Sequence, residues 1–181
     1  MRSAGQDIDV TNPGKEIFHR ITKQQIIDYY KSVASIMLSH IKQRPLSLER
    51  FPDGVEGEIF YQKRLPGYFP EWIGTAEVKK GQEKQTQVAI NSRAGILYLA
   101  NQVCTPHIWL SRAERLEQPD RMVFDLDPSD LDSAVAAAKV LRKELKKRHL
   151  IPFLMLTRGK GMHVGVPIRP EKTFEVVRKI A

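Results

Sequence analysis

Two aspartates spaced one residue apart, Asp125 and Asp127, lie in the segment RMVFDLDPSD (121–130), directly after the apolar stretch 122–124. In a β-strand, alternate side chains point to the same face, and their α-carbons lie about 6.5–7 Å apart. Two carboxylates arranged in this way can share one divalent cation or bracket two, and their oxygens suit hard cations such as Mg²⁺ or Mn²⁺. The pattern is therefore typical of a divalent metal site at the end of a buried strand.

Helix capping is the alternative interpretation of the same acids. Asp127, Ser129 and Asp130 stand just before a helical pattern, and Asp and Ser are favoured N-cap residues. Capping explains one of the acids, but it leaves two acids on one face of an apolar strand without a role. On spacing alone, both interpretations remain open.

The segment TRGKGMHV (157–164) is a second group of residues that can bind a ligand. Its two glycines allow a tight turn to bring backbone N–H groups close to a phosphate, while Lys160 adds a positive charge and His163 begins the next strand. The alternative is a glycine-rich hairpin turn with a solvated lysine. Combined with the acid pair, the segment forms a β–α–β–β unit that can hold metal and triphosphate together.

Aromatic and histidine side chains occur in two further strand-like segments. Phe60 and Tyr61 are neighbours in IFYQK, so one of the two rings must face away from the buried side, where it can stack on a base. His107 precedes Trp109 by two residues in PHIWL and shares its face. Packing within the strand is the alternative for these side chains.

Basic residues near the first predicted helix are candidates for phosphate binding. The segment TNPGKEIF (11–18) carries Asn12 and Lys15 around a Pro-Gly turn, and Lys23 follows at the N-terminus of the helix. A lysine there opposes the helix dipole unless an anion occupies the same N-terminus. A solvated lysine is the alternative.

The composition favours a polyanionic partner. The 181 residues carry a formal net charge of +8, which attracts nucleic acid or an anionic membrane surface. No apolar run approaches the length of a spanning helix and the first ten residues lack a signal-peptide core, so no membrane association is expected. The single cysteine, Cys104, cannot form an internal disulfide and is predicted to be a buried apolar residue in a cytoplasmic, nucleoid-associated protein.

Local patterns predict the elements that position these groups. Thr22 and Gln25 form a capping box for a helix with apolar residues at helical spacing up to Ile41. The pattern from 44 to 63 predicts a hairpin, with 52–57 as its turn. The remaining predictions for the first half are a loop at 64–73, a strand–turn–strand segment at 75–90, a helix at 92–102 and a short apolar stretch at 107–110.

The second half is predicted to continue the alternation of strands and helices. A strand at 122–127 is followed by a helix at 131–149, and strands at 152–157 and 163–168 flank the glycine-rich turn. Pro170 is expected at the first position of a last helix. Helices between strands indicate an α/β fold with a mixed sheet. The long helix is expected to bury Leu131, Val135, Ala138, Leu141 and Leu145.

The chain resembles the polymerase domain of bacterial ligase D, a member of the archaeo-eukaryotic primase superfamily that acts in non-homologous end joining. The resemblance runs in order along nearly the whole chain, through TNPGK, TKQQIIDYYKSVA, RPLSLERFPDGVEGEIFYQK, PDRMVFDLDP and TRGKGMHVGVPI. It implies a primase-polymerase-like α/β fold with a mixed central sheet flanked by helices.

The resemblance also implies an activity and a set of site residues. The activity is addition of NTPs or dNTPs to a primer 3′-hydroxyl by two-metal catalysis, in which one metal activates the hydroxyl and the other stabilises the leaving pyrophosphate. Asp125 and Asp127 are the implied catalytic ligands of Mn²⁺ or Mg²⁺. The implied nucleotide-binding residues are Phe60, Tyr61, His107, Thr157, Lys160 and His163. The implied contacts to the 5′-phosphate of a DNA gap or end are Asn12, Lys15 and Lys23.

The implied partners are DNA with gaps or double-strand breaks, an NTP or dNTP, a Ku-like protein and a ligase module. One domain is expected over 1–181, in which 1–73 binds the DNA end and 74–181 binds metal and nucleotide. The third metal-binding aspartate of the family lies in a later strand, so the chain is expected to be the N-terminal part of the family domain. Arg158 also stands where the family has a small residue. The alternative function is a catalytically incomplete module that binds DNA ends.

Overall fold

The computed structural model describes residues 1–80, 83–157 and 161–181. They form two compact units, Met1–Glu114 and Arg115–Ala181. From the sequence we expected a lobe boundary at 73/74. The division lies further along the chain because the strands that follow residue 74 join the sheet of the first unit.

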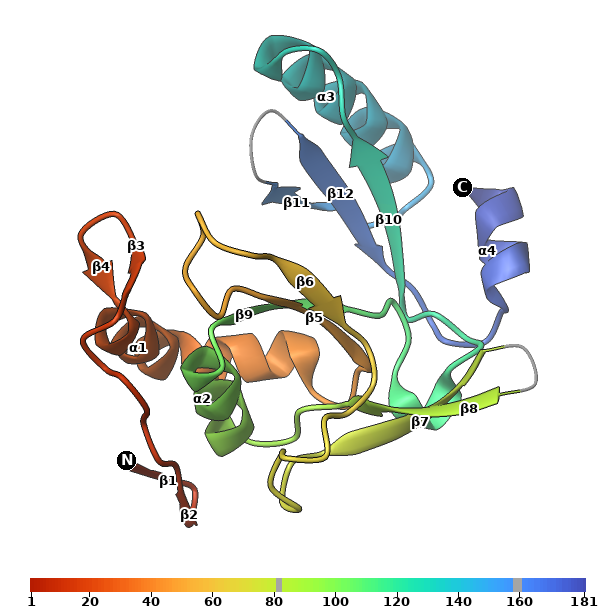
Figure 1. Ribbon diagram of the computed structural model, residues 1–181. Helices are drawn as coiled ribbons and strands as arrows, with labels where there is room; N and C mark the ends of the chain where they lie inside the picture. Colours follow the sequence, from red (N-terminus) through yellow and green to blue (C-terminus); the bar gives the residue numbers. More distant parts are fainter. Residues whose placement is uncertain (81–82, 158–160) are drawn as a thin grey trace. The chain divides into compact units, whose positions relative to one another are not determined.

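An antiparallel five-stranded sheet is the centre of the first unit (Figure 1). The central strand β5 pairs through one edge with β9 and through the other with β6, and it meets β8 at Leu46. The hairpin predicted at 44–63 is confirmed as β5 and β6, and the strand–turn–strand segment is confirmed as β7 and β8. The strands are β5 (Leu46–Arg50), β6 (Phe60–Gln62), β7 (Thr75–Lys80), β8 (Glu83–Val88) and β9 (Cys104–Ile108).

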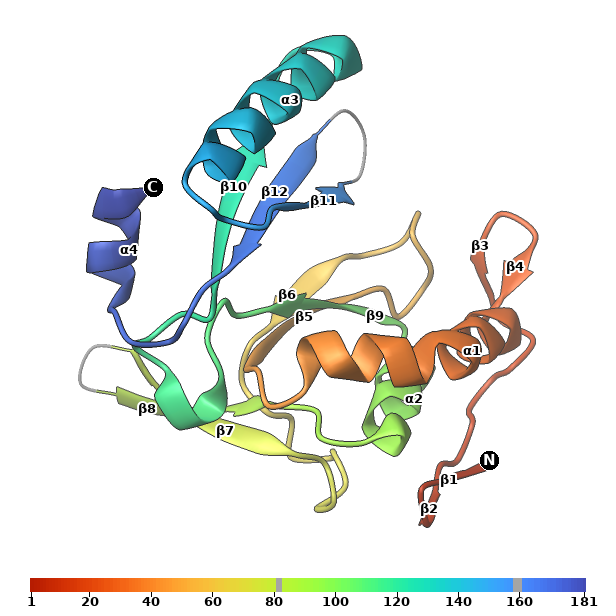
Figure 2. The same ribbon diagram turned by 180° about the vertical axis from the view of Figure 1, so that it is seen from behind.

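Two helices, α1 (Lys23–Ile41) and α2 (Arg93–Asn101), pack against this sheet (Figure 2). Helix α1 begins where the sequence predicted, because the Thr22 side chain accepts a hydrogen bond from the Gln25 amide and the Gln25 side chain accepts one from the Thr22 amide. The helices and β5 share one apolar core, in which each fully buried aliphatic side chain contributes about 2 kcal/mol. Its buried members include Ala34, Ile41, Leu46, Leu48, Ile96 and Leu99.

The N-terminal segment lies ahead of α1 as two short hairpins. The second hairpin buries Ile17 with Phe51 and Val103, which fixes the chain just before α1 to the end of β5. This contact holds the basic residues around the Pro-Gly turn in place. The strands are β1 (Arg2–Ser3), β2 (Gln6–Asp7), β3 (Glu16–Phe18) and β4 (Ile21–Thr22).

The second unit is a three-stranded antiparallel sheet with α3 packed against it. Strand β12 lies between β10 and β11 and is antiparallel to both, so β10 and β11 run parallel without touching. This is the β–α–β–β unit predicted from the sequence. The elements are β10 (Arg121–Leu126), α3 (Leu131–Lys147), β11 (Phe153–Leu156), β12 (Met162–Pro167) and α4 (Phe174–Ile180), after a single 3₁₀ turn η1 (Ala113–Arg115).

The structure confirms the α/β class and changes three details. Within the described residues every strand pair is antiparallel and the strands are divided between two main sheets, whereas we expected one mixed sheet. The last helix begins after Thr173 rather than at Pro170, because the Thr173 hydroxyl accepts a hydrogen bond from the Val176 amide and caps the helix there. Leu131 is half exposed, because the side chains of α3 that pack on the sheet begin one turn later, at Ala134.

Cys104 is buried, as predicted, and its thiol donates a hydrogen bond to the Leu99 carbonyl. Burial raises the pKa of this thiol to about 12. No helix among the described residues is both long enough and apolar enough to cross a membrane.

Candidate functional site

Strand β10 separates apolar and acidic side chains onto its two faces. Met122, Phe124 and Leu126 pack into the core with α3. Asp125 points to the other face, and Asp127 continues the alternation just past the end of the strand; both carboxylates are exposed. Asp125 thus lies on the face away from the core, as the spacing predicts, and Asp127 is exposed one residue beyond the end of the strand.

His163 lies directly across from Asp125 on the neighbouring strand β12. Its Nε2 atom is 3.2 Å from Oδ1 of Asp125, while 71% of the Asp125 side chain and 30% of the His163 side chain remain exposed. The predicted acid and histidine thus meet, and the carboxylate still has oxygen lone pairs that face solvent.

Gly161 brings Thr157 and Asp127 together at the end of the β11–β12 hairpin. The Thr157 amide donates a hydrogen bond to the Gly161 carbonyl at 3.2 Å. A Cβ atom at position 161 would lie 2.5 Å from Thr157 Oγ1 and 3.7 Å from Asp127 Oδ1. A side chain at position 161 would displace the threonine hydroxyl, so glycine leaves room for Thr157 in this conformation. Lys160 lies outside the described residues.

Asp130 is the acid that caps helix α3. Its carboxylate accepts hydrogen bonds from the backbone amide and the hydroxyl of Ser133, both at 2.8 Å, so this residue is the N-cap of α3. The bond from the Ser133 amide is the main reason why the pKa of Asp130 is lowered. One acid caps the helix, and the cap does not use Asp125 or Asp127.

The chemistry of these donors fits a hard divalent cation. Asp125 and Asp127 offer carboxylate oxygens, which Mg²⁺ and Mn²⁺ prefer, and both are exposed on one side of the strand. Within residues 1–80, 83–157 and 161–181, no three His, Cys, Asp or Glu side chains gather closely enough to form a metal site by themselves. A cation held by the pair would therefore complete its coordination with oxygens of a bound molecule or water.

In the first unit, Tyr61 and His107 lie on one face of the sheet and share a carboxylate. Tyr61 donates a hydrogen bond from its hydroxyl to Oε1 of Glu49 at 3.2 Å. His107 Nε2 is 3.2 Å from Oε2 of the same residue. The two rings are tilted, with their centroids 5.7 Å apart. The structure thus brings two of the predicted nucleotide-binding residues together.

Phe60 lies on the opposite face of β6 from Tyr61. Its ring stacks on the guanidinium of Arg50, whose carbon is 5.8 Å from the ring centroid. Arg50 is buried and also donates to Gln62 and to the Tyr68 hydroxyl, both at 2.7 Å. Of the aromatic pair predicted to contact a base, only Tyr61 shares a face with His107.

The predicted phosphate-binding lysines are held by the protein itself. Lys15 Nζ donates to the Pro52 carbonyl at 2.7 Å and to Oδ1 of Asp53 at 2.8 Å. Lys23 is buried, and its Nζ donates to the Thr11 hydroxyl at 3.0 Å. Burial, with the nearby positive charges of Lys15 and Arg50, lowers the pKa of Lys23.

The first backbone amides of α1 already donate hydrogen bonds within the protein. The Lys23 amide donates to the Lys15 carbonyl at 2.8 Å, the Gln24 amide to the Pro13 carbonyl at 2.9 Å, and the Gln25 amide to the Thr22 hydroxyl. The turn that starts at Asn12, which has a left-handed φ of 49°, supplies two of these acceptors. A phosphate here would bind lysine ammonium groups rather than helix amides.

Two residues of these clusters were not predicted from the sequence. Glu49 joins Tyr61 to His107, and Asp53 holds Lys15. Strand alternation places Glu49 on the face away from Leu48, but its contact with Tyr61 depends on the register across the hairpin. The sequence does not show that register.

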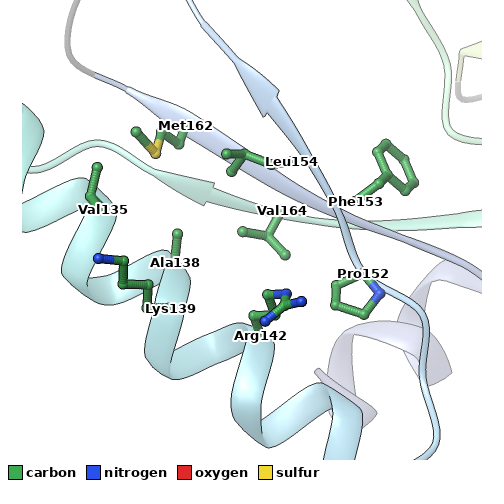
Figure 3. A pocket seen from close by; sticks show the side chains of 9 residues that line it. All are labelled: Val135, Ala138, Lys139, Arg142, Pro152, Phe153, Leu154, Met162 and Val164. Atoms are coloured by element: carbon green, nitrogen blue, oxygen red, sulfur yellow. The ribbon is translucent and has the colours of Figure 1, made fainter.

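A cavity of about 220 Å³ lies between α3 and strands β11 and β12 (Figure 3). Ala138 and Arg142 line it from the helix, and Leu154 and Val164 line it from the strands. Because His163 and Val164 are neighbours on β12, their side chains point to opposite faces. The cavity is therefore separate from the candidate metal site.

An acid pair beside a glycine-bearing hairpin, together with a basic cluster in a chain of net charge +8, is typical of proteins that bind nucleotides and nucleic acid. Residues 22–181 match the family described as LigD, primase-polymerase domain. The chain belongs to this family, and the resemblance drawn from the sequence is confirmed.

Similar proteins occur in several bacteria. The chain is 31% identical over 169 residues to the multifunctional non-homologous end joining protein LigD of Mycolicibacterium smegmatis, covering 89% of this chain and 22% of the relative. It is 27% identical over 178 residues to the bifunctional non-homologous end joining protein LigD of Bacillus subtilis, covering 95% and 28%. The chain thus spans only about a quarter of the length of these relatives.

A solved structure shares the fold. It is the polymerase domain from Mycobacterium tuberculosis ligase D in complex with DNA, which superposes with a TM-score of 0.84 at 30% identity. The match covers 93% of this chain and 63% of that one. The similarity confirms the predicted fold class.

Proposed function

We propose that this chain adds NTPs or dNTPs to the 3′-hydroxyl of a primer at DNA gaps or broken ends, in repair by non-homologous end joining. The proposal rests on the family, on relatives described as non-homologous end joining proteins, and on a similar polymerase domain that was solved with DNA. The observation that carries it is the exposed pair Asp125 and Asp127, set on the solvent face of β10 beside the hairpin that holds Thr157 and His163.

Asp125 and Asp127 would hold divalent metal, Mn²⁺ or Mg²⁺. When bound, the metal supplies positive charge for the attacking hydroxyl and the departing pyrophosphate. His163 contacts Asp125 and orients its carboxylate. Thr157 and His163, with Lys160, would bind the triphosphate, because the hairpin combines a hydroxyl and positive charge with the small Gly161.

In the first unit, Tyr61 would stack on the incoming base and His107 would contact the triphosphate. Tyr61 fits this role because its ring is largely exposed and held at its hydroxyl end by Glu49. The predicted contribution of Phe60 stays a prediction.

Lys15 and Lys23, with Asn12, would bind the 5′-phosphate on the downstream side of a gap. Their ammonium groups lie around a single turn that is fixed to α1 by backbone hydrogen bonds. A Ku-like protein and a ligase module are proposed partners, since relatives of this chain are multifunctional end-joining proteins.

Primer extension tests this function. The substrate is a gapped duplex with a 5′-phosphate downstream, and incorporation of ATP or dATP is measured with Mn²⁺, with Mg²⁺ and with EDTA. Metal-dependent extension templated by the gap is expected. If the protein binds this duplex but extends the primer neither with Mn²⁺ nor with Mg²⁺, the polymerase function is contradicted.

A module that only binds DNA ends is the second candidate. It is favoured by the lysine cluster, whose contacts do not involve the acid pair. In that case Asp125→Asn leaves every measurable activity of the protein unchanged, and the preference for 5′-phosphorylated ends remains.

A further inference from the structure

Glu49 occupies the centre of the face that carries Tyr61 and His107. It lies on β5, while Tyr61 comes from β6 on one edge and His107 from β9 on the other. Each of its two carboxylate oxygens contacts one of these partners at 3.2 Å. Three adjacent strands thus contribute one group each to a single cluster.

The cluster differs from an ordinary surface ion pair. Glu49 points away from the apolar core that contains Leu48, yet only 22% of its side chain is exposed, against 49% for His107. Two partners on opposite sides hold the carboxylate in one place. The side chain is thus already ordered in the folded protein, and a contact with His107 costs little further conformational entropy.

A carboxylate in this position is unexpected on electrostatic grounds. If His107 contacts a triphosphate, a glutamate beside it would repel that ligand. The charge of Glu49 acts on Tyr61, whose pKa it raises, so the phenol stays protonated and donates to the carboxylate. The other oxygen faces His107 Nε2. If Glu49 assists nucleotide binding, it must therefore do so through Tyr61 or His107.

We propose that Glu49 is a positioning residue for nucleotide binding, which orients the imidazolium form of His107 so that Nε2–H donates to the Glu49 carboxylate and Nδ1–H donates to a phosphate of the nucleotide. A carboxylate that accepts from one ring nitrogen fixes the orientation of the ring and favours the charged form, in which the second nitrogen can also donate. The same carboxylate holds Tyr61 beside the histidine. This inference rests on the proposed function of His107.

The substitution Glu49→Gln tests it, because the two side chains have the same shape and differ in charge. Affinity is measured for ATP with Mn²⁺ and for adenosine, which lacks phosphates. We expect ATP to bind about five- to tenfold more weakly, as for loss of a charged hydrogen-bond partner, with little change for adenosine. A glutamate that merely repels phosphate predicts the opposite sign. Unchanged or tighter ATP binding would therefore overturn the proposal.

Two matched variants sharpen the test. In a His107→Ala background, Glu49→Gln should cause no further loss of ATP affinity, because the carboxylate acts through the histidine. Glu71→Gln, which removes an exposed glutamate from the loop at 64–73, should leave ATP binding unchanged. An additional loss in the His107→Ala background would show that Glu49 acts on the nucleotide by another route, against the proposal.

Nitrogen-15 NMR of the His107 ring in the complex with ATP and Mg²⁺ provides a second readout. The parent chain should show protons on both ring nitrogens, which donate to Glu49 and to phosphate, and Glu49→Gln should lose this doubly protonated signature. The same ring signature in both complexes would overturn the proposal. If the signature changes but His107→Ala leaves ATP affinity intact, the inferred ligand role fails together with the proposed function of His107, and the fault lies with the latter.

Discussion

The lysine cluster before α1 and the acid pair at the end of β10 carry opposite charges, and they differ in how far the protein compensates them. Lys15 is paired with Asp53, and Lys23 is buried against Thr11. Asp125 meets His163 but stays 71% exposed, and Asp127 is also exposed. The ammonium groups of the basic cluster thus have partners within the protein, whereas the carboxylates of the acid pair face solvent.

This difference predicts different responses to a ligand. An anion that approaches Lys15 must compete with the carboxylate of Asp53, so its binding is a balance between two acceptors. A cation that approaches the acid pair finds exposed oxygens. We therefore expect substitutions in the acid pair to abolish a function and substitutions in the lysine cluster to shift an equilibrium.

The largest expected effect belongs to Asp125→Asn and Asp127→Asn. Each should reduce nucleotide incorporation by about a hundredfold or more, since losing metal assistance removes several kcal/mol of transition-state stabilisation. Primer extension on gapped DNA and Mn²⁺ binding followed by electron paramagnetic resonance check this. Asp132→Asn, a nearby exposed acid in the first turn of α3, is the control. Near-normal extension by either variant would refute the metal assignment.

A smaller effect is expected from Lys15→Ala. The variant should lose about tenfold in affinity for gapped DNA with a 5′-phosphate and little for DNA with a 5′-hydroxyl, because one charged hydrogen bond to the terminal phosphate is removed. Affinities for both duplexes are compared at one salt concentration. Lys31→Ala, on the exposed side of α1, should weaken both duplexes alike. Equal weakening by Lys15→Ala would assign Lys15 to general phosphate attraction.

Asp53→Asn should act in the opposite direction. Removing the charge that holds Lys15 frees its ammonium group, so affinity for 5′-phosphorylated DNA should rise about two- to fivefold. The gain should vanish when Lys15→Ala is also present, which a titration of the double variant measures. A gain that persists without Lys15 would mean that Asp53 only repels DNA at long range.

Local patterns were sufficient to predict the longer helices and most of the longer strands, whereas the four short strands before α1 were not predicted. The capping box of α1 depends on two residues three positions apart, and the acidic face of β10 depends on strict alternation after an apolar run. Both were predicted and both are present, because neighbouring residues decide them.

Contacts that depend on register or on burial were not predictable. Glu49 reaches Tyr61 only because residues 51–59 set the pairing of β5 with β6, and a connection of this kind does not fix register as a two-residue turn does. The partner of Lys15 lies 38 positions away. The burial of Lys23 likewise depends on how the segment before α1 folds back onto the helix, which no local pattern reports.

The smallest expected effect concerns the pH dependence of the basic cluster through Lys23. Its pKa is lowered by burial and by the charges of Lys15 and Arg50, and a bound phosphate favours the protonated form. The preference for 5′-phosphorylated DNA should therefore be greatest at pH values below this lowered pKa and decline as pH rises through it. Lys23→Met should remove that decline.

Lys23 also determines the direction in which the free energy of unfolding changes with pH. Between the lowered pKa of Lys23 and its ordinary value, the unfolded chain binds more protons than the folded one, so the free energy of unfolding rises with pH across this window. Urea denaturation of the parent chain and of Lys23→Met across the alkaline range up to the ordinary lysine pKa measures the difference. Lys15→Ala, which removes one of the charges that lower the pKa of Lys23, should raise the lower edge of the window and so narrow it. Parallel curves for all three proteins would show that Lys23 does not titrate in this range, and the pH dependence of phosphate binding would then lie in the DNA or in other groups.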